Sequence, residues 1–323
     1  MELTNASFEK ADGVASCPTA DLPNLTDSIA EKTLCVFTPT YNRAYCLNSL
    51  FASLKAQTCF DFCWLIVDDG STDETEKLVE SFQSESTPFP IEYIKQENGG
   101  KARAHNTGVE HCANELFFCV DSDDHLAADS IESILDAWQP VRCDPEIAGI
   151  ITLDGADDST PLTKPFPKGL ERVTRWDLYY KHGHSGDIAS VYRTELLRIF
   201  PFQIAEGEKF MAETFVYHQI DQYFKMLILN KITIIAEYRE DGYTSNVRKV
   251  TRQNPRSYAM HKRRLIEYSD TFLLKYENNV LYLVGCILGK VEHGVRNAPN
   301  PAMAALAYLP ARLLCVTVYR DKG

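Results

Sequence analysis

The stretch Phe117–Asp124, which reads FFCVDSDD, places three carboxylates directly after an apolar run. A short apolar run of this kind is typical of a strand that is buried on both faces of a sheet. Open α/β sheets bind ligands at the carboxyl ends of their strands. Asp121 and Asp123 are two residues apart, so the chain must turn if both are to face one cation. Such oxygen ligands suit Mg²⁺ or Mn²⁺. The alternative is an acidic loop that caps a helix starting near Ala127.

Polar loops also follow the strands predicted upstream. The loop 38–43 (TPTYNR) ends the first strand, and the loop 68–73 (DDGSTD) ends the second. The loop 98–103 (NGGKAR) follows a third strand and leads into a helix, so that its glycines and cations are a suitable seat for a diphosphate. Together these loops describe a site for a nucleoside diphosphate, although the chain contains neither a P-loop nor a GxGxxG motif.

Strand, loop and helix alternate four times between the first strand and Asp124. This alternation predicts a parallel sheet of the doubly wound type, and right-handed crossovers would bring the loops to one edge of it. Farther along, the sequence predicts strands over 147–153, 188–192 and 232–237, and a long amphipathic helix over 215–229.

Composition narrows the class of protein. A chain of 323 residues with 45% hydrophobic content is long enough for one large domain, or for one domain with an appendage. The net charge of −12 argues against a nucleic-acid binder, because phosphate contacts need a basic surface. Ten cysteines occur without a CxxC pair or zinc-like spacing, which favours a cytosolic compartment. We find no secretion signal and no apolar run of the roughly 18–20 residues that cross a bilayer.

Four motifs, in their order and spacing, resemble those of the family 2 glycosyltransferases. The resemblance is dense over residues 33–130 and continues faintly to about residue 245. It implies an α/β fold of the GT-A nucleotide-diphospho-sugar transferase type, with a mostly parallel central sheet and flanking helices. It also implies a nucleotide-sugar donor, a divalent metal and inversion at the anomeric carbon. The motifs are TPTYNR (38–43), VDDGSTD (67–73), NGGKARAHNTG (98–108) and DSDD (121–124).

The resemblance assigns roles to residues at the matching positions. Asp123 would bind the metal directly, and Asp121 would hold the metal or the ribose. Asp69 is the stronger candidate for direct contact with uracil and ribose, whereas Asp68 has helix capping or buried polar support as its alternative. The residues expected to bind the nucleotide-sugar are Thr38, Pro39, Tyr41, Arg43, Asp68, Asp69, Gly100, Lys101, Arg103, Asp121 and Ser122.

Inversion requires a general base that deprotonates the acceptor hydroxyl. In the family this base is commonly an acid at the start of a helix, often one of two adjacent acids. Glu213 is the first candidate here and Glu208 the second, although Thr214 stands where the second acid is frequent. The alternative for Glu213 is a first-turn acid that is stabilised by the helix dipole. The loop 182–187 (HGHSGD) is either a surface loop or a metal site.

We expect a leader at 1–31, a catalytic domain at 32–245 and a basic, amphipathic helical extension at 246–323. Residues 245–266 contain seven Lys or Arg and no acid. This segment would clamp a diphosphate, contact anionic lipid, or form a solvated helix face. The later apolar segments would pack on the domain or lie in a membrane interface.

Together with the family resemblance, the sequence therefore predicts a cytoplasmic, metal-dependent inverting hexosyltransferase that uses Mg²⁺ or Mn²⁺ and is associated peripherally with the inner face of the cell membrane. It would move sugar from a UDP-sugar to a saccharide or lipid-linked acceptor in surface polysaccharide synthesis. One alternative is a sugar-nucleotide-binding protein that has lost its base. The other is a sugar-phosphate nucleotidyltransferase, a class that carries a glycine-rich phosphate loop where this chain has TPTYNR.

Overall fold

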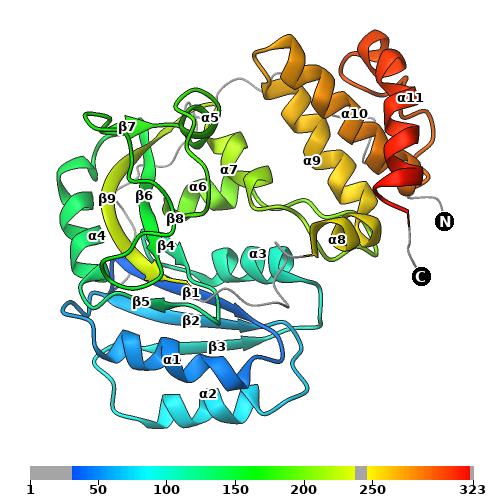
Figure 1. The fold of residues 1–323 in the computed structure, drawn as a ribbon. Helices are drawn as coiled ribbons and strands as arrows, with labels where there is room; N and C mark the ends of the chain where they lie inside the picture. The colour runs from blue at the N-terminus through cyan, green and yellow to red at the C-terminus, as the bar shows by residue number, and fades with distance from the viewer. Residues whose placement is uncertain (1–30, 237–245, 321–323) are drawn as a thin grey trace. The chain divides into compact units, whose positions relative to one another are not determined.

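The computed structural model describes residues 31–236 and 246–320. These residues divide into two compact units, an α/β unit (31–236) and a helical C-terminal unit (246–320) (Figure 1). The leader expected at 1–31 lies outside the described residues, apart from its last one.

One mixed sheet is the frame of the α/β unit. Among the described residues it has nine strands, in the order β3-β2-β1-β4-β8-β6-β9-β5, with β7 paired to β9. The strands are β1 (Leu34–Thr40), β2 (Phe62–Asp68), β3 (Ile91–Lys95), β4 (Leu116–Cys119), β5 (His125–Leu126), β6 (Ile147–Gly155), β7 (Arg172–Val173), β8 (Ile188–Arg193) and β9 (Lys225–Ile235).

The first four strands are parallel, as the alternation of strand and helix predicts. Strand β1 lies between β2 and β4, and β3 pairs with β2. The other half is mixed, because β8 runs antiparallel to β4 and β6, while β6 and β9 are parallel. The loops after β1, β2 and β4 therefore leave the same edge of the sheet.

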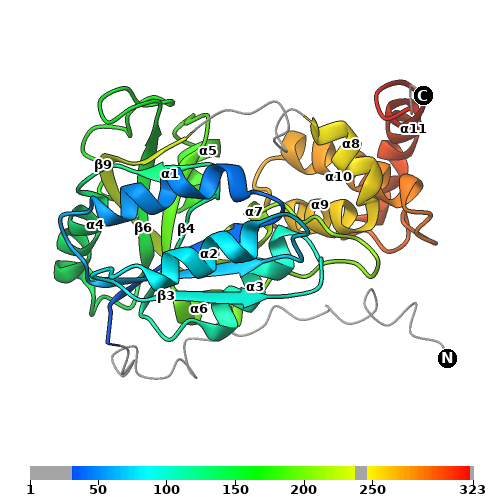
Figure 2. The same cartoon turned by 90° about the horizontal axis from the view of Figure 1, so that it is seen from below.

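Helices cover both faces of the parallel half. Helices α1 and α2 lie on one face and α3 lies on the other (Figure 1), and Figure 2 shows α1 and α2 side by side across the strands. The helices of this unit are α1 (Ala44–Lys55), α2 (Thr75–Ser84), α3 (Lys101–His111), α4 (Ser130–Trp138), α5 (Arg175–Tyr180), α6 (Thr194–Ile199) and α7 (Thr214–Ile220).

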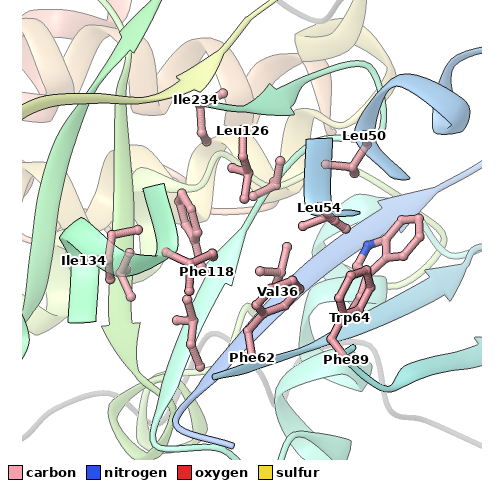
Figure 3. Packing of buried hydrophobic residues seen from close by; sticks show 14 of the residues in the cluster. Val36, Leu50, Leu54, Phe62, Trp64, Phe89, Phe118, Leu126, Ile134 and Ile234 are labelled. Carbon is pink, nitrogen blue, oxygen red and sulfur yellow. The ribbon is translucent and has the colours of Figure 1, made fainter. Parts of the chain in front are cut away.

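The main apolar core lies between the sheet and helices α1, α2 and α4 (Figure 3). Five aromatic rings stack within it. The ring centroid of Phe51 lies 4.2 Å from that of Phe82 and 5.9 Å from that of Trp64, while Phe62 stacks on Phe89 at 4.6 Å. Full burial of one large apolar side chain contributes about 1.5–3 kcal/mol, so this cluster anchors α1 and α2 to the strands.

Helix α3 approaches the opposite face of the sheet closely because Gly108 has no side chain. A Cβ atom at this position would lie 2.4 Å from the ring of Phe37 in β1. That ring in turn stacks on Phe117 in β4, with centroids 4.8 Å apart. This packing holds the first turn of α3 beside the ends of β1 and β4.

The helix predicted over 215–229 is wrong in its second half. Helix α7 ends at Ile220, and β9 begins at Lys225. The next residue after α7, Asp221, accepts hydrogen bonds from the first two backbone amides of α5, at 2.9 and 2.8 Å. The first residues of β9 pair with β6 and β7, so tertiary pairing overrides the helical spacing of the sequence.

The C-terminal unit is a helical assembly with its own core. Helix α10 packs against both α9 and α11, and small residues such as Ala259, Ala304 and Ala307 lie at the contacts. In the part of the chain that the structure describes, no helix is long and apolar enough to cross a membrane. The helices are α8 (Val247–Gln253), α9 (Pro255–Tyr268), α10 (Phe272–Leu288) and α11 (Pro301–Thr317).

Candidate active site

The loops after β1 and β2 are bound to each other at the carboxyl edge of the sheet. Asn42 adopts a positive φ of 52°, which turns its side chain toward the second loop. The Asn42 carboxamide oxygen accepts from the backbone N–H of Thr72 at 2.8 Å, and the backbone N–H of Asn42 donates to Ser71 Oγ at 2.8 Å. The two predicted nucleotide-binding loops thus form one rim.

Asp68 and Asp69 are both buried, and both organise this rim. Asp68 accepts from the backbone N–H of Ser71 at 2.7 Å and from the hydroxyl of Tyr93 at 2.6 Å. This arrangement corresponds to the buried polar support that was the alternative interpretation of Asp68. Direct contact between either carboxylate and a nucleotide stays a prediction.

The carboxylate of Asp69 also binds the loop that contains Gly99 and Gly100. Its two oxygens accept from the backbone N–H groups of Gly99 and Gly100, at 2.8 and 2.7 Å, and from the side chains of Gln96 and Asn98, at 2.7 and 3.2 Å. The two glycine amides, which we expected to face a diphosphate, therefore hold a protein carboxylate in this structure.

Gly100 allows a second loop to pack against the start of α3. It has a φ of 92°, and a Cβ atom there would lie 1.8 Å from the carbonyl oxygen of Lys209. Arg103 donates to the carbonyl oxygens of Gly99 and Glu208, at 2.7 and 2.6 Å. Arg103 thereby ties α3 to the loop that precedes Glu213.

Lys101 joins the two acids to which the sequence assigns the chemistry. Its Nζ lies 2.6 Å from Asp121 Oδ1 and 2.7 Å from Glu213 Oε1. The side chain of Lys101 is 27% exposed, and those of Asp121 and Glu213 are 43% and 46% exposed, so the cluster lies open to solvent. Lys101 is therefore an ion-paired residue and not part of a solvated helix face.

The three charged groups of this cluster shift one another's pKa values. The positive charge of Lys101 lowers the pKa of Glu213 below its usual value. The surrounding protein removes part of the water around Asp121, and this partial desolvation raises the pKa of Asp121 in spite of the same cation. Burial alone would lower the pKa of Lys101, but the two carboxylates outweigh it and raise the pKa well above its usual value. Farther along α3, burial lowers the pKa of His105 to about 4, so its ring is neutral at pH 7.

Asp123 is turned toward the loop after β1. Its Oδ2 accepts a hydrogen bond from Arg43 Nη1 at 2.9 Å, and the side chains of both residues are 21% exposed. A backbone hydrogen bond of 3.0 Å from Asp124 to Asp121 closes the turn required by the two-residue spacing. Ser122, between the two acids, is buried.

The remaining nucleotide-binding predictions lie along β1 and the loop after it. Thr38 is buried and accepts from the indole N–H of Trp64 at 3.0 Å, and Pro39 is buried in the same strand. Tyr41 is exposed beside the rim. Of these three residues, Tyr41 alone presents its side chain to solvent.

The donor set at Asp121 and Asp123 fits a divalent cation of the Mg²⁺ or Mn²⁺ type. Within the described ranges no three His, Cys, Asp or Glu side chains converge on one point. Two carboxylates are nevertheless the usual protein share of a Mg²⁺ site, because substrate phosphates and water complete the shell. In this structure the cations Lys101 and Arg43 balance the two carboxylates.

The two candidate bases, Glu208 and Glu213, differ in their exposure to solvent. Glu208 is buried, with 5% of the residue exposed, and its loop is fixed to α3 through Arg103. Glu213 is half-exposed and directly precedes α7, where it interacts with Lys101. The geometry therefore favours Glu213 over Glu208 for contact with an acceptor.

A second polar cluster, which the sequence patterns did not indicate, is centred on Arg175 at the start of α5, whose charge acts on one residue of β6 and one residue of β8. It comprises Asp154, Arg175 and Tyr192, all buried. Asp154 Oδ1, Arg175 Nε and the Tyr192 hydroxyl have no hydrogen-bond partner among the described residues. The guanidinium of Arg175 also stacks on Tyr217 of α7, 4.8 Å from the ring centroid. Burial raises the pKa of both Asp154 and Tyr192, and the nearby carboxylate of Glu213 adds to both shifts.

No local signal in the sequence pointed to this cluster. Its members come from three separate elements, and each residue alone is ordinary for a strand end or a first helical turn. Only the order of the mixed half of the sheet brings them together.

The loop 182–187 does not form the metal site that we considered. In the described part of the chain, His182, His184 and Asp187 make no three-ligand group. His184 is buried and packs against Phe166 and Tyr179, with ring centroids 5.4 and 5.5 Å away. These contacts favour the surface-loop interpretation.

Comparison with known proteins agrees with the geometry. The model of the family described as glycosyl transferase family 2 matches residues 35–200, just over half of the chain. The putative teichuronic acid biosynthesis glycosyltransferase TuaG of Bacillus subtilis is 30% identical over 129 residues, which cover 40% of this chain and 50% of TuaG. The chain spans half or less of the length of the first curated relatives that it matches.

Two solved structures share the fold. TarS of S. aureus (residues 1–349), in complex with UDP-GlcNAc, superposes with a TM-score of 0.55 at 17% identity and covers 89% of this chain and 93% of its own. The mannosyltransferase PcManGT of Pyrobaculum calidifontis, in complex with GDP-Man and Mn²⁺, has a TM-score of 0.53 at 17% identity and covers 91% and 84%. These likenesses confirm the predicted GT-A type fold.

Burial of Asp154 makes the stability of the protein depend on pH in a way that can be measured. Burial, and then the carboxylate of Asp187, raise the pKa of Asp154 to about 7. The unfolded value is about 3.9, so the folded protein binds more protons between about pH 4 and pH 7. The contribution of Asp154 to stability is therefore complete below that window and is lost as the pH rises through it. We expect Asp154→Asn to raise the melting temperature at pH 8, with a gain that shrinks toward pH 4.

Thermal unfolding of the variant and the wild type at a series of pH values measures this gain. Asp157→Asn is the matched control, because hydrogen bonds from Ser159 lower the pKa of Asp157 to about 2. This control should give no stabilisation at pH 8. Equal melting temperatures of Asp154→Asn and wild type at pH 8 would contradict the account of Asp154.

Proposed function

The chain belongs to glycosyl transferase family 2, and we propose that it is an inverting hexosyltransferase that uses a UDP-sugar. The acceptor in this proposal is a saccharide or a lipid-linked oligosaccharide of surface polysaccharide synthesis, on the cytoplasmic side of the membrane. The catalytic domain would comprise residues 32–245, and residues 246–323 would be its extension.

One observation carries the proposal: Lys101 joins Asp121, at the end of β4, to Glu213, at the start of α7. Asp121, one of the two candidate metal ligands, and Glu213, an accessible candidate base, thus lie on either side of one cation. The relatives support the choice of substrates, since TuaG is named for teichuronic acid biosynthesis and TarS was solved with UDP-GlcNAc.

Asp123 and Asp121 would hold Mg²⁺ or Mn²⁺, which supplies positive charge beside a diphosphate leaving group. PcManGT, solved with Mn²⁺, supports a metal of this type. Arg43 and Lys101 lie against the same carboxylates and add two protein cations to the diphosphate region. The chain's own charges therefore favour the departure of a nucleoside diphosphate.

Glu213 would accept the proton of the acceptor hydroxyl. Lys101 lowers its pKa and so keeps the carboxylate ionised, which is the form that accepts a proton. The second polar cluster offers both donors and acceptors in the unpaired atoms of Asp154, Arg175 and Tyr192. Sugar hydroxyls, which need both kinds of partner, are the groups that we assign to it.

Asp123→Ala tests the metal site. We expect the variant to lose most of its turnover, about 100-fold or more, since charge stabilisation at the leaving group is usually a large share of catalysis. The measurement is release of UDP or GDP from a panel of nucleotide-sugars, with mixed saccharide acceptors and Mn²⁺. Asp129→Ala, which removes an exposed ion pair with Lys231, is the control and should stay near wild-type activity. Near-normal turnover of Asp123→Ala would remove the metal-site proposal.

Glu213→Gln and Glu208→Gln together identify the base. We expect Glu213→Gln to lose about 10²–10⁴-fold in turnover, the usual contribution of a general base, while its affinity for the nucleotide stays within a few-fold. Glu208→Gln should retain turnover if the protein remains folded, which thermal unfolding checks. The opposite ranking of the two variants would transfer the role to Glu208. Nucleotide binding by wild type without transfer from any donor would favour a binding protein that has lost catalysis.

A further inference from the structure

The last helix of the C-terminal unit exposes an apolar stripe. Leu306, Leu309, Leu313 and Val316 in α11 are 70%, 77%, 61% and 60% exposed. They recur at intervals of three and four residues, so they lie on one face of the helix. The opposite face is formed by small buried residues that contact α10, such as Ala304, Ala307 and Ala311.

The unit that carries this stripe has an excess of positive charge. Helix α11 contains no acidic residue, and its single charged side chain is the exposed Arg312. Residues 246–320 carry twelve Lys or Arg and four Asp or Glu, a net charge of +8, whereas the whole chain has −12. Two of the cations, Arg263 and Arg264, pair with one of the four acids, Glu267. The unit thus keeps a large positive excess in an otherwise acidic protein.

Two partners would cover an exposed leucine stripe: a lipid surface or another protein surface. A second copy of this chain would bring one +8 unit against another, which electrostatic repulsion disfavours. An anionic lipid surface attracts the same charge and accepts leucine side chains at the boundary of head groups and acyl chains. The charge therefore favours lipid.

We propose that the stripe formed by Leu306, Leu309, Leu313 and Val316 docks the C-terminal unit on an anionic membrane surface. Helix α11 then lies in the plane of the interface, with its leucines inserted and Arg312 and Arg320 near the head groups. Neither the metal nor the base of the α/β unit takes part in this contact. Its test therefore stands apart from that of the glycosyltransferase activity.

Flotation of the full chain with vesicles measures the docking. We expect binding to vesicles of phosphatidylcholine containing phosphatidylglycerol, and at least about tenfold weaker binding to pure phosphatidylcholine, because roughly 1 kcal/mol is gained for each basic residue near an anionic surface. Leu309→Ser/Leu313→Ser removes apolar area without a change of charge, and should weaken binding to the anionic vesicles by about tenfold or more.

The matched control is Leu273→Ser. Leu273 is 73% exposed but lies in the first turn of α10, outside the stripe. We expect this variant to bind anionic vesicles like the wild type. Equal loss in the control and in the double variant would overturn the assignment to α11. Absence of vesicle binding would overturn the proposal, as would dimerisation without lipid that Leu309→Ser/Leu313→Ser abolishes.

Discussion

The ion pairs of Lys101 are the interaction on which the candidate active site depends. Asp121 and Glu213 belong to segments that are far apart in the sequence, and two neighbouring carboxylates repel each other unless a cation lies between them. Lys101 supplies that cation from the first residue of α3. Its own position follows from two glycines: Gly108 lets α3 approach β1, and Gly100 lets the loop that precedes Glu213 approach α3. Packing at two glycines and electrostatics at one lysine therefore assemble the site.

Asp69 also has a structural role in the site. A buried carboxylate is costly unless it is hydrogen-bonded, and Asp69 accepts two backbone and two side-chain hydrogen bonds from the loop 96–100. It fixes the glycine loop against the end of β2 and so determines where α3 begins. A residue within a recognisable nucleotide-binding motif thus acts on the site by shaping the loop that carries Lys101.

Much of this architecture follows from local sequence. Strands β1, β2 and β4 were predictable because each is a short apolar run that ends in polar residues, and the motifs marked Asp121, Asp123 and Lys101. The mixed half of the sheet was harder to predict from the sequence, since residues 225–229 have helical spacing but pair as a strand with β6 and β7. The cluster of Asp154 and Arg175 had no local signal, because its members meet only through long-range strand order. The exposure of the α11 leucines likewise depends on which face α10 covers.

Calorimetric titration of UDP into the protein tests the central claim, a metal–diphosphate site at Asp121 and Asp123, most directly. The account predicts binding in the presence of Mn²⁺ and its loss when EDTA removes the metal. Arg43 and Lys101 already balance the charges of Asp123 and Asp121, so the metal would supply the further positive charge that a diphosphate needs. Titrations of GDP and dTDP under the same conditions show whether the nucleobase contributes to the choice of nucleotide. Binding of equal strength with Mn²⁺ and with EDTA would contradict the metal site. No binding of any of the three nucleotides with Mn²⁺ would contradict the nucleotide site itself.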